Sequence, residues 1–173
     1  MNVKSLTRIS FLLVLAILLF SCKDNKNDKE GSKESKENLA PVRISNESDE
    51  QALRDACLEG DLEMVKAVLS KNLNVNAVDQ EGRTALMFAA FNGHQQIVEA
   101  LLDKGAEVDI ADRMGRTALI YASTGPFEGT VKILLEHDAD PNIVDNDEHF
   151  TALMYAAAEG NKDVAEVLLK NNA

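Results

Sequence analysis

The feature of this 173-residue sequence that most constrains its fold is an internal repeat with a period of 33 residues. Residues 81–112 read EGRTALMFAAFNGHQQIVEALLDKGAEVDIAD, and residues 114–145 read MGRTALIYASTGPFEGTVKILLEHDADPNIVD. A period of this size is typical of solenoids, in which each unit buries its apolar face only against neighbouring units. We therefore expect a stack of small units rather than one central core.

Two more copies flank this pair. One begins at Phe150 and reads FTALMYAAAEGNKDVAEVLLKNNA; its Thr151 follows Thr117 by 34 residues, so one residue is inserted between residues 145 and 150. A more divergent copy, EQALRDACLEGDLEMVKAVLSKNLNVNAVD, comes first. The predicted repeat domain spans residues 49–173, with repeats at about 49–80, 81–113, 114–147 and 148–173.

Each copy has the pattern of two short helices followed by a finger-like loop. A threonine before the first helix can cap its N-terminus: Thr84, Thr117 and Thr151. A glycine separates the two helices: Gly60, Gly93 and Gly160. The position after the second helix suits a left-handed C-cap: Asn72, Gly105, Asp138 and Asn172. The predicted fold is an all-α solenoid of about four helix–turn–helix repeats with short β-turn fingers.

The 33-residue period, the GxTxL opening, the paired alanines, the NG or EG turn, the LL pair and the GAxVD-like ending resemble the ankyrin repeat. This resemblance covers residues 49–173. The family's TPLH reads TALM, TALI and TALM at residues 84–87, 117–120 and 151–154, so the proline and the histidine are absent. The resemblance implies a protein-binding module, in a stack less rigid than the family's histidine would make it. The third copy has Gly125-Pro126-Phe127 between its helices, which predicts a reshaped turn.

The resemblance also implies a binding surface, because partners of ankyrin repeats usually contact the finger tips and the concave ends of the first helices. Carried over by position, the predicted finger residues are Gln80, Glu81, Arg83, Arg113, Met114, Arg116, Asn146, Asp147, His149 and Phe150. The predicted residues on the first helices are Phe91, Asn92 and Glu159. Two alternatives stay open: Arg83 and Arg116 either bind a partner or neutralise local acids, and Phe91 either binds a partner or packs on the adjacent helix.

Charge narrows the kind of partner. Residues 49–173 hold 23 acidic and 10 basic side chains, which disfavours binding to nucleic acid. An acidic surface suits a protein partner with a basic surface, and an inhibitor or immunity-type role would follow if that surface were an active site. The repeat domain itself is expected to be a monomer, with no cofactor.

Nothing in the sequence indicates an enzyme. The three histidines, His94, His137 and His149, stand at different repeat positions without metal-ligand spacing. Cys57 stands where two other copies have alanine, which predicts a buried, unreactive thiol. The rival hypothesis is a redox-protective or enzymatic factor that uses Cys57 or a histidine.

The N-terminus carries a processing signal. Lys4 and Arg8 precede an apolar run at residues 11–20, FLLVLAILLF, which is short for a membrane span and typical of a signal peptide. Ser21-Cys22 ends this run and resembles the lipobox of bacterial lipoproteins, which implies cleavage after residue 21 and acylation of Cys22. A polar tether at residues 22–48 would follow. We expect a protein of the bacterial cell envelope, held in the outer membrane and facing the periplasm or the cell surface. A plain signal peptide or an uncleaved anchor helix is the alternative.

Overall fold

The computed structural model describes residues 47–173, so the predicted signal peptide, Cys22 and nearly all of the tether lie outside the described residues. Within this range the chain forms eight helices and no strand. Their bounds are α2 (Glu47–Glu59), α3 (Leu62–Leu69), α4 (Ala85–Phe91), α5 (Gln95–Asp103), α6 (Ala118–Ser123), α7 (Glu128–Glu136), α8 (Ala152–Glu159) and α9 (Lys162–Lys170). Glu47 and Ser48, assigned to the tether from sequence, thus belong to the first helix.

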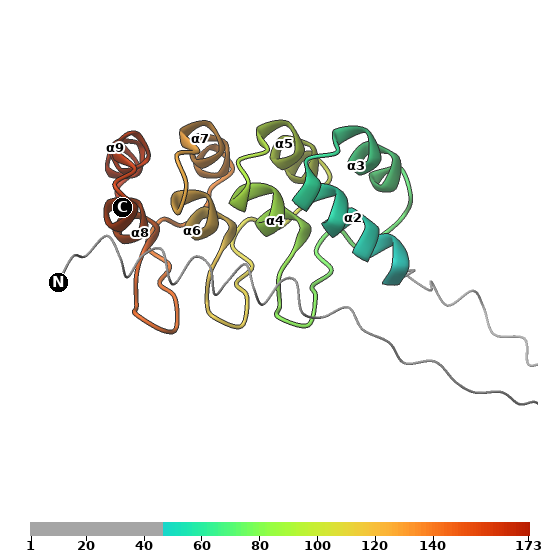
Figure 1. The fold of residues 1–173 in the computed structure, drawn as a ribbon, viewed down its shortest axis with the longest axis horizontal. Coiled ribbons are helices and arrows are strands. Elements are labelled where there is room, and N and C mark those ends of the chain that lie inside the picture. Colours follow the sequence, from blue (N-terminus) through green and yellow to red (C-terminus); the bar gives the residue numbers. More distant parts are fainter. Residues whose placement is uncertain (1–46) are drawn as a thin grey trace, which may run out of the picture. The chain divides into compact units, whose positions relative to one another are not determined.

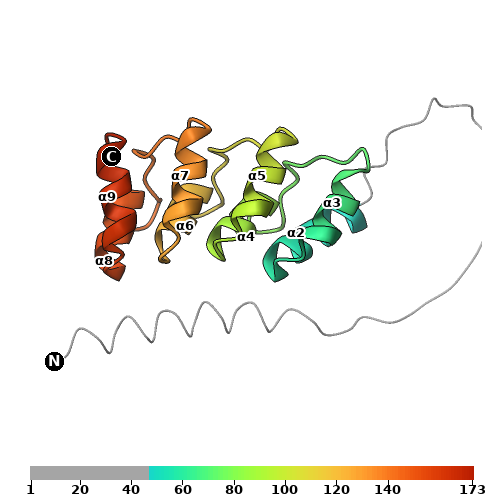
Figure 2. The same ribbon diagram turned by 90° about the horizontal axis from the view of Figure 1, so that it is seen from above.

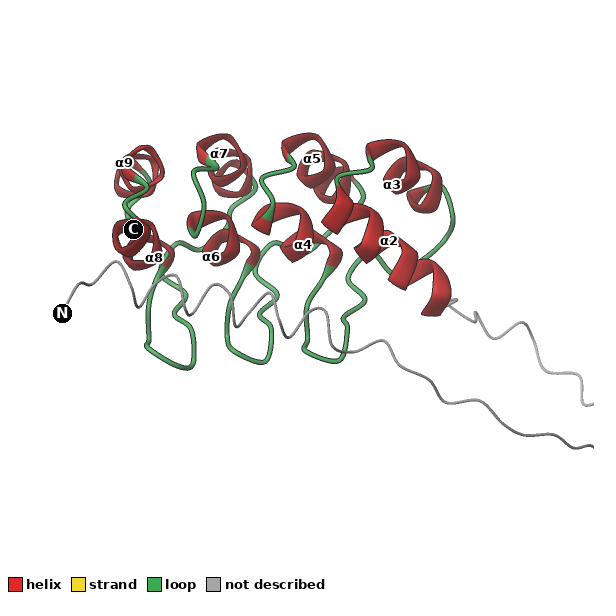
Figure 3. Ribbon diagram, viewed as in Figure 1, coloured by secondary structure: helices red, strands yellow, loops and turns green. Residues whose placement is uncertain are grey.

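The eight helices are arranged as four antiparallel pairs. Figure 1 shows α2, α4, α6 and α8 in a lower row, with α3, α5, α7 and α9 above them. Figure 2 shows the same pairs side by side along one line. Between consecutive pairs the chain descends into long loops, coloured green in Figure 3, which are the fingers. The prediction of an all-α helical repeat solenoid is confirmed.

Threonine caps begin the first helix in three copies, as the sequence predicts. The Thr84 hydroxyl accepts a hydrogen bond from the Met87 N–H at 3.3 Å. Thr117 and Thr151 accept the equivalent bonds at 3.4 Å. These bonds satisfy one of the backbone donors that a helix N-terminus leaves without an intrahelical acceptor.

The turn between the helices differs in the third copy. Gly60, Gly93 and Gly160 have φ values of 79°, 70° and 76°, a conformation that favours glycine. The third copy has Pro126 at this position, whose ring holds φ negative, and α6 ends at Ser123, earlier in the repeat than α4. The Phe127 ring covers Gly93 so closely that it leaves no room for a side chain there. The sequence Gly-Pro-Phe therefore reshapes this turn, as predicted.

The second helix of three copies ends in a Schellman motif. In the second copy the Leu101 carbonyl accepts from the Ala106 N–H at 3.0 Å, around a left-handed Gly105. Asp138 and Asn172 are left-handed at the same position, each with φ of 63°. The prediction of a left-handed cap is confirmed at these three residues.

The first copy breaks this rule, and the prediction for Asn72 is wrong. Asn72 does not have a positive φ, and the Leu73 N–H bonds to the Lys71 carbonyl instead of reaching back into α3. Leu73 occupies the position where the other copies have alanine, for example Ala139, which is only 5% exposed. Because a leucine is too large for the space beneath the helix end, the chain leaves α3 along a different path.

Apolar burial holds neighbouring pairs together. Leu101, Leu119 and Leu134 are completely buried, and burying a side chain of this size stabilises a protein by about 1.5–3 kcal/mol. Alanines at the helix crossings, Ala89 and Ala122, are also fully buried, so the first helices approach closely. No helix within residues 47–173 has the length and apolar character needed to cross a membrane.

Candidate functional site

An aspartate closes each finger at its base. In the first finger the Asp79 carboxylate accepts from the backbone N–H groups of Glu81 at 2.9 Å and Arg83 at 2.8 Å. Asp112 accepts from Met114 and Arg116 in the same way, at 2.8 and 2.9 Å. Each aspartate thus fixes its finger in one conformation, in the manner of an Asx turn.

The third finger keeps this closure despite its additional residue. Asp145 accepts from the N–H groups of Glu148 at 3.0 Å and Phe150 at 3.1 Å, one residue further along than in the other fingers. The predicted insertion is accommodated at the tip, where His149 adopts a left-handed conformation with φ of 57°. Glycine fills the equivalent place in the other fingers, so His149 is held in a backbone conformation that non-glycine residues rarely adopt.

Neighbouring fingers are joined through their backbones. The Arg113 N–H donates to the Glu81 carbonyl at 2.9 Å, and the Asn146 N–H donates to the Met114 carbonyl at 2.8 Å. A second bond runs from the Asn146 side chain to the Arg113 carbonyl at 3.3 Å. The finger tips therefore form one connected platform.

Arg83 and Arg116 fold back onto their own fingers. Arg83 pairs with Asp79 at 2.8 Å and Glu81 at 3.3 Å, and its guanidinium lies 4.8 Å from the centre of the Phe88 ring. Arg116 pairs with Asp112 at 3.3 Å and lies 5.0 Å from the Tyr121 ring centre. Their side chains are 23% and 30% exposed. This geometry favours neutralisation of local acids over partner binding; the role of the two arginines stays a prediction.

The aromatic position next to the fingers is half-buried rather than part of the core. Phe88, Tyr121 and Tyr155 share it, and each is only partly exposed. The Tyr121 hydroxyl donates to Asp112 at 2.6 Å, and the Tyr155 hydroxyl donates to Asp145. In the third and fourth repeats this position thus connects the first helix to the aspartate that closes the preceding finger.

These contacts shift the acidity of the groups involved. Burial alone would raise the pKa of Asp79, but hydrogen bonds and the charge of Arg83 lower it below its ordinary value. Burial likewise opposes the hydrogen bonds to Asp145, and the pKa of Asp145 is again lowered. The pKa values of Tyr121 and Tyr155 are raised, first by burial and then because each hydroxyl donates to a carboxylate. All four shifts favour the charged aspartates and the neutral tyrosines, which are the forms present at neutral pH.

The predicted residues on the concave face have mixed surroundings. Phe91 is half-buried and packs edge-to-face on Tyr121 of the next repeat, with ring centres 6.0 Å apart. Asn92 donates to the carbonyls of Leu58 and Phe88, both at 3.2 Å, and so links two first helices. Glu159 is exposed at the end of α8. Phe91 thus packs on the adjacent helix, which is one of the two alternatives that the sequence left open. Part of its side chain is still accessible to solvent.

The fingers also expose apolar side chains, two of which were not predicted from the sequence. Exposed among the predicted residues are Gln80, Glu81, Arg113, Met114, Asn146, Asp147 and His149, while Phe150 packs on Tyr155 with ring centres 5.7 Å apart. Val78 and Val144 are 50% and 40% exposed at the same position of two fingers, and Met114 is 39% exposed. The sequence holds no signal that marks these valines as exposed, because their exposure depends on which side of the finger faces solvent.

The groups named in the rival enzymatic hypothesis have no reactive setting. Cys57 is completely buried, and burial raises the pKa of its thiol to about 12. The His94 ring packs over Gly60, and His137 and His149 are exposed at a helix end and a finger tip. Within residues 47–173 there is no cluster of side chains able to hold a metal ion.

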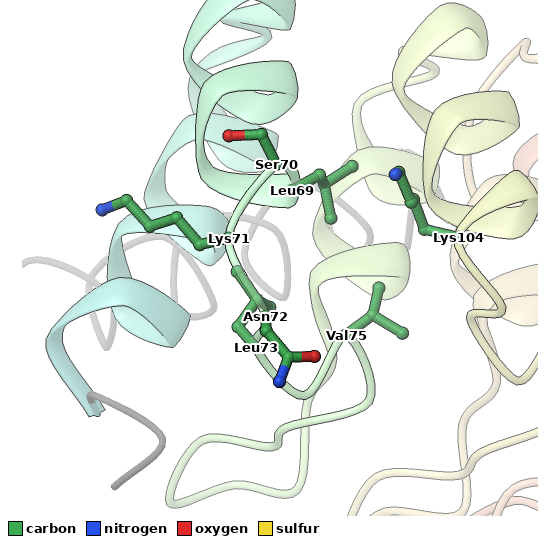
Figure 4. A pocket seen from close by; sticks show the side chains of 7 residues that line it. All are labelled: Leu69, Ser70, Lys71, Asn72, Leu73, Val75 and Lys104. Carbon is green, nitrogen blue, oxygen red and sulfur yellow. The ribbon is translucent and has the colours of Figure 1, made fainter. Parts of the chain in front are cut away.

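A shallow hollow lies where the first copy departs from the repeat pattern. It measures about 310 Å³, and Figure 4 shows its lining residues: Leu69, Ser70, Lys71, Asn72, Leu73, Val75 and Lys104. Its only charged side chains are two lysines, and it is open to solvent. It therefore has the shape of a surface depression rather than that of an enclosed small-molecule site.

Comparison with known proteins identifies the repeat. A family model described as ankyrin repeats (3 copies) matches residues 14–112, 53–145 and 106–173. No curated protein matches the chain. Ankyrin-repeat proteins are typically binding modules rather than enzymes. By its repeated sequence and its stacked helix pairs, the chain belongs to the ankyrin-repeat family, and its repeat domain is a protein–protein interaction module.

Proposed function

We propose that this protein binds a partner protein through its fingers and concave face while its N-terminus is anchored in a bacterial membrane. The observation that carries the binding surface is the pairing of rigidity with exposed apolar side chains. Aspartate bonds close the fingers, and backbone bonds from Arg113 and Asn146 join them. Because the fingers are already ordered, binding of a partner does not have to offset the entropic cost of ordering them.

The chemistry of this surface favours a basic partner. Val78, Met114 and Val144 provide apolar contact, and exposed acids such as Glu81 and Asp147 stand at the finger tips. Complementary charge steers association and discriminates between partners. An inhibitor or immunity-type factor would cover a basic active site with this face.

The test is capture of the partner from cells. Full-length tagged protein is crosslinked in intact cells, purified, and its partners are identified by mass spectrometry. A matched pair of variants then assigns the surface: Val78→Glu with Val144→Glu, and Met64→Glu as the control. Met64 is 49% exposed on α3, away from the fingers, so it matches Val78 in exposure. We expect the finger variant to lose the captured partner and the control to retain it.

Two results would reject the finger surface. One is capture of the same partner at the same yield by both variants. The other is loss of the partner only in Met64→Glu, which would move the binding surface to α3.

The anchor is supported by the sequence alone. Ser21-Cys22 closes the apolar run at the position of a lipobox, and Lys23 follows it, which favours the outer membrane over retention in the inner membrane. Several acyl chains make a stable anchor, since each buried methylene contributes about 0.8 kcal/mol. We expect Cys22→Ser to release the protein from membranes or to leave an uncleaved precursor. A Cys22→Ser protein of mature size that stays in the membrane fraction would show that the anchor lies elsewhere.

A further inference from the structure

The outer face of the last repeat carries the side chains that interior repeats use for stacking. Met87 and Ile120 occupy one repeat position and are 2% and 1% exposed, whereas Met154 at the same position is 49% exposed. At another position Leu102 is 8% exposed and Leu169 is 60% exposed.

A third position follows the same pattern. Ala90 and Ser123 are completely buried, and the equivalent Ala157 is exposed. Figure 2 shows α8 and α9 as the last pair of the row. The face that these helices leave uncovered is thus an interior-type stacking face, here called the α8–α9 face and defined by Met154, Ala157 and Leu169.

The opposite end of the stack is polar. On α2 and α3, Gln51, Asp55 and Glu63 are exposed, and an ion pair joins Lys66 to Glu63. A second ion pair joins Asp49 to Lys71, which follows α3. In the second repeat, the position on the second helix that faces the preceding repeat is held by Ile97, which is 2% exposed. In the first repeat the same position is held by Met64, which is 49% exposed. Terminal repeats of solenoids need such a polar outer face, and only this end of the described stack has one.

From this asymmetry we propose that the α8–α9 face binds the same face of a second copy of this chain, which forms a closed, two-fold symmetric dimer. Head-to-tail stacking would press the apolar α8–α9 face against the charged end formed by α2 and α3, and would leave those charges desolvated. Two identical faces, by contrast, bury apolar side chains on both sides, and an isologous contact closes after two subunits. The inference is independent of the partner proposed for the fingers and replaces the expectation of a monomer.

Charge permits this pairing at the α8–α9 face. Residues 151–173 hold three acidic and two basic side chains, in a domain that holds 23 acidic and 10 basic ones between residues 49 and 173. Along α9 the signs alternate, with Glu166 lying 3.8 Å from Lys162 and 4.0 Å from Lys170. Two strongly acidic domains therefore meet at their least charged end, where repulsion is smallest.

The size of the face predicts a weak dimer. Each copy contributes parts of two helices of eight and nine residues, whereas stable interfaces commonly involve about 20–30 residues on each side. Association should accordingly depend on protein concentration.

Sedimentation equilibrium of the full-length chain tests the proposal, in a density-matched detergent and over about 5 to 500 µM, because a weak dimer forms by mass action. Three proteins are compared: the natural chain, Met154→Glu with Leu169→Glu, and Met64→Glu. The N-terminal segment is common to all three, so any association that it causes is the same throughout. Met154 and Met64 are both 49% exposed and Leu169 is 60% exposed, so the fold should tolerate glutamate at each of these positions.

We expect the natural chain and Met64→Glu to approach the mass of a dimer with the same constant, and Met154→Glu with Leu169→Glu to associate at least ten-fold more weakly. A natural chain that stays monomeric over the whole range would overturn the proposal. So would a dimer that survives the double substitution, or one that Met64→Glu disrupts. Circular dichroism of each variant verifies that the helices are retained.

Discussion

The helical stack and the fingers of this protein are held together by different forces. Inside the stack, leucines such as Leu101 and Leu119 are fully buried and alanines let the helices approach closely. In the fingers, where the chain has little apolar surface to bury, the carboxylates of Asp79 and Asp112 accept backbone hydrogen bonds instead.

This difference separates stability from recognition. Apolar burial is large and does not depend on pH, so the stack provides most of the free energy of unfolding. Hydrogen bonds contribute about 1 kcal/mol each, but they are directional, and they fix the exposed side chains of the fingers in place. Four predictions test the comparison, ordered by their expected effect on the free energy of unfolding.

The largest effect is expected from a cavity in the stack. Leu101→Ala should lower the free energy of unfolding by about 2–5 kcal/mol, because the fully buried side chain leaves an unfilled space between repeats. Urea denaturation followed by circular dichroism measures the change. Met64→Ala is the control, since Met64 is 49% exposed and its loss should cost less than about 0.5 kcal/mol. Equal losses for both variants would mean that the stack is not held by buried leucines.

The next largest effect concerns the closure of a finger. Asp112→Ala should cost about 2–3 kcal/mol, because the Met114 and Arg116 N–H groups and the Tyr121 hydroxyl lose their acceptor. Asp147→Ala removes an exposed carboxylate from a finger and should change little. The same denaturation experiment compares the two. A loss for Asp112→Ala no greater than that of the control would show that the carboxylate does not hold the finger.

A smaller effect distinguishes the two hypotheses for the finger arginines. Arg83→Glu with Arg116→Glu should lower the free energy of unfolding by about 1–2 kcal/mol, since partly exposed ion pairs contribute about 0–1 kcal/mol each and the new charges repel Asp79 and Asp112. If the arginines only neutralise these acids, affinity for the captured partner changes less than ten-fold. A larger loss of affinity with unchanged stability would instead assign the arginines to recognition.

The smallest effect is expected from titration of the fingers. The lowered pKa values of Asp79 and Asp145 stabilise the fold above the ordinary carboxylate pKa of about 4, and this contribution is lost as the pH falls through the lowered values. The raised pKa values of Tyr121 and Tyr155 stabilise the fold below about pH 10, and this contribution is lost above it. Thermal melts should show a plateau between these limits. Asp79→Asn should reduce the acid dependence; an unchanged acid limb would exclude Asp79 as its source.

Much of the fold followed from local patterns. The threonine caps at Thr84, Thr117 and Thr151, the glycine turns and the burial of Cys57 all matched the structure, because each depends on one residue type at one repeat position. The prediction for Asn72 was wrong because its outcome depends on the neighbouring Leu73, whose size the pattern did not take into account.

The candidate site was less predictable than the fold. The sequence placed the fingers correctly along the chain. A repeat pattern does not distinguish a side chain that is exposed from one that forms ion pairs within its own finger. Arg83 and Arg113 both lie on fingers, yet Arg83 is held by two carboxylates while Arg113 is exposed. Val78 and Val144 were missed for the same reason, since their exposure depends on which side of the finger faces solvent.

The sequence by itself determined the repeat, the helix pairs and the family of this protein, because a 33-residue period leaves few ways to bury its apolar positions. Only the tertiary structure decided at which copies of a repeat position the side chain is buried and at which it is exposed. Met87 and Met154 occupy the same place in the repeat, and one is buried while the other is exposed. The physical reason is that burial in a solenoid comes from the neighbouring unit, and α8 and α9 have no such neighbour on their outer side within the described chain.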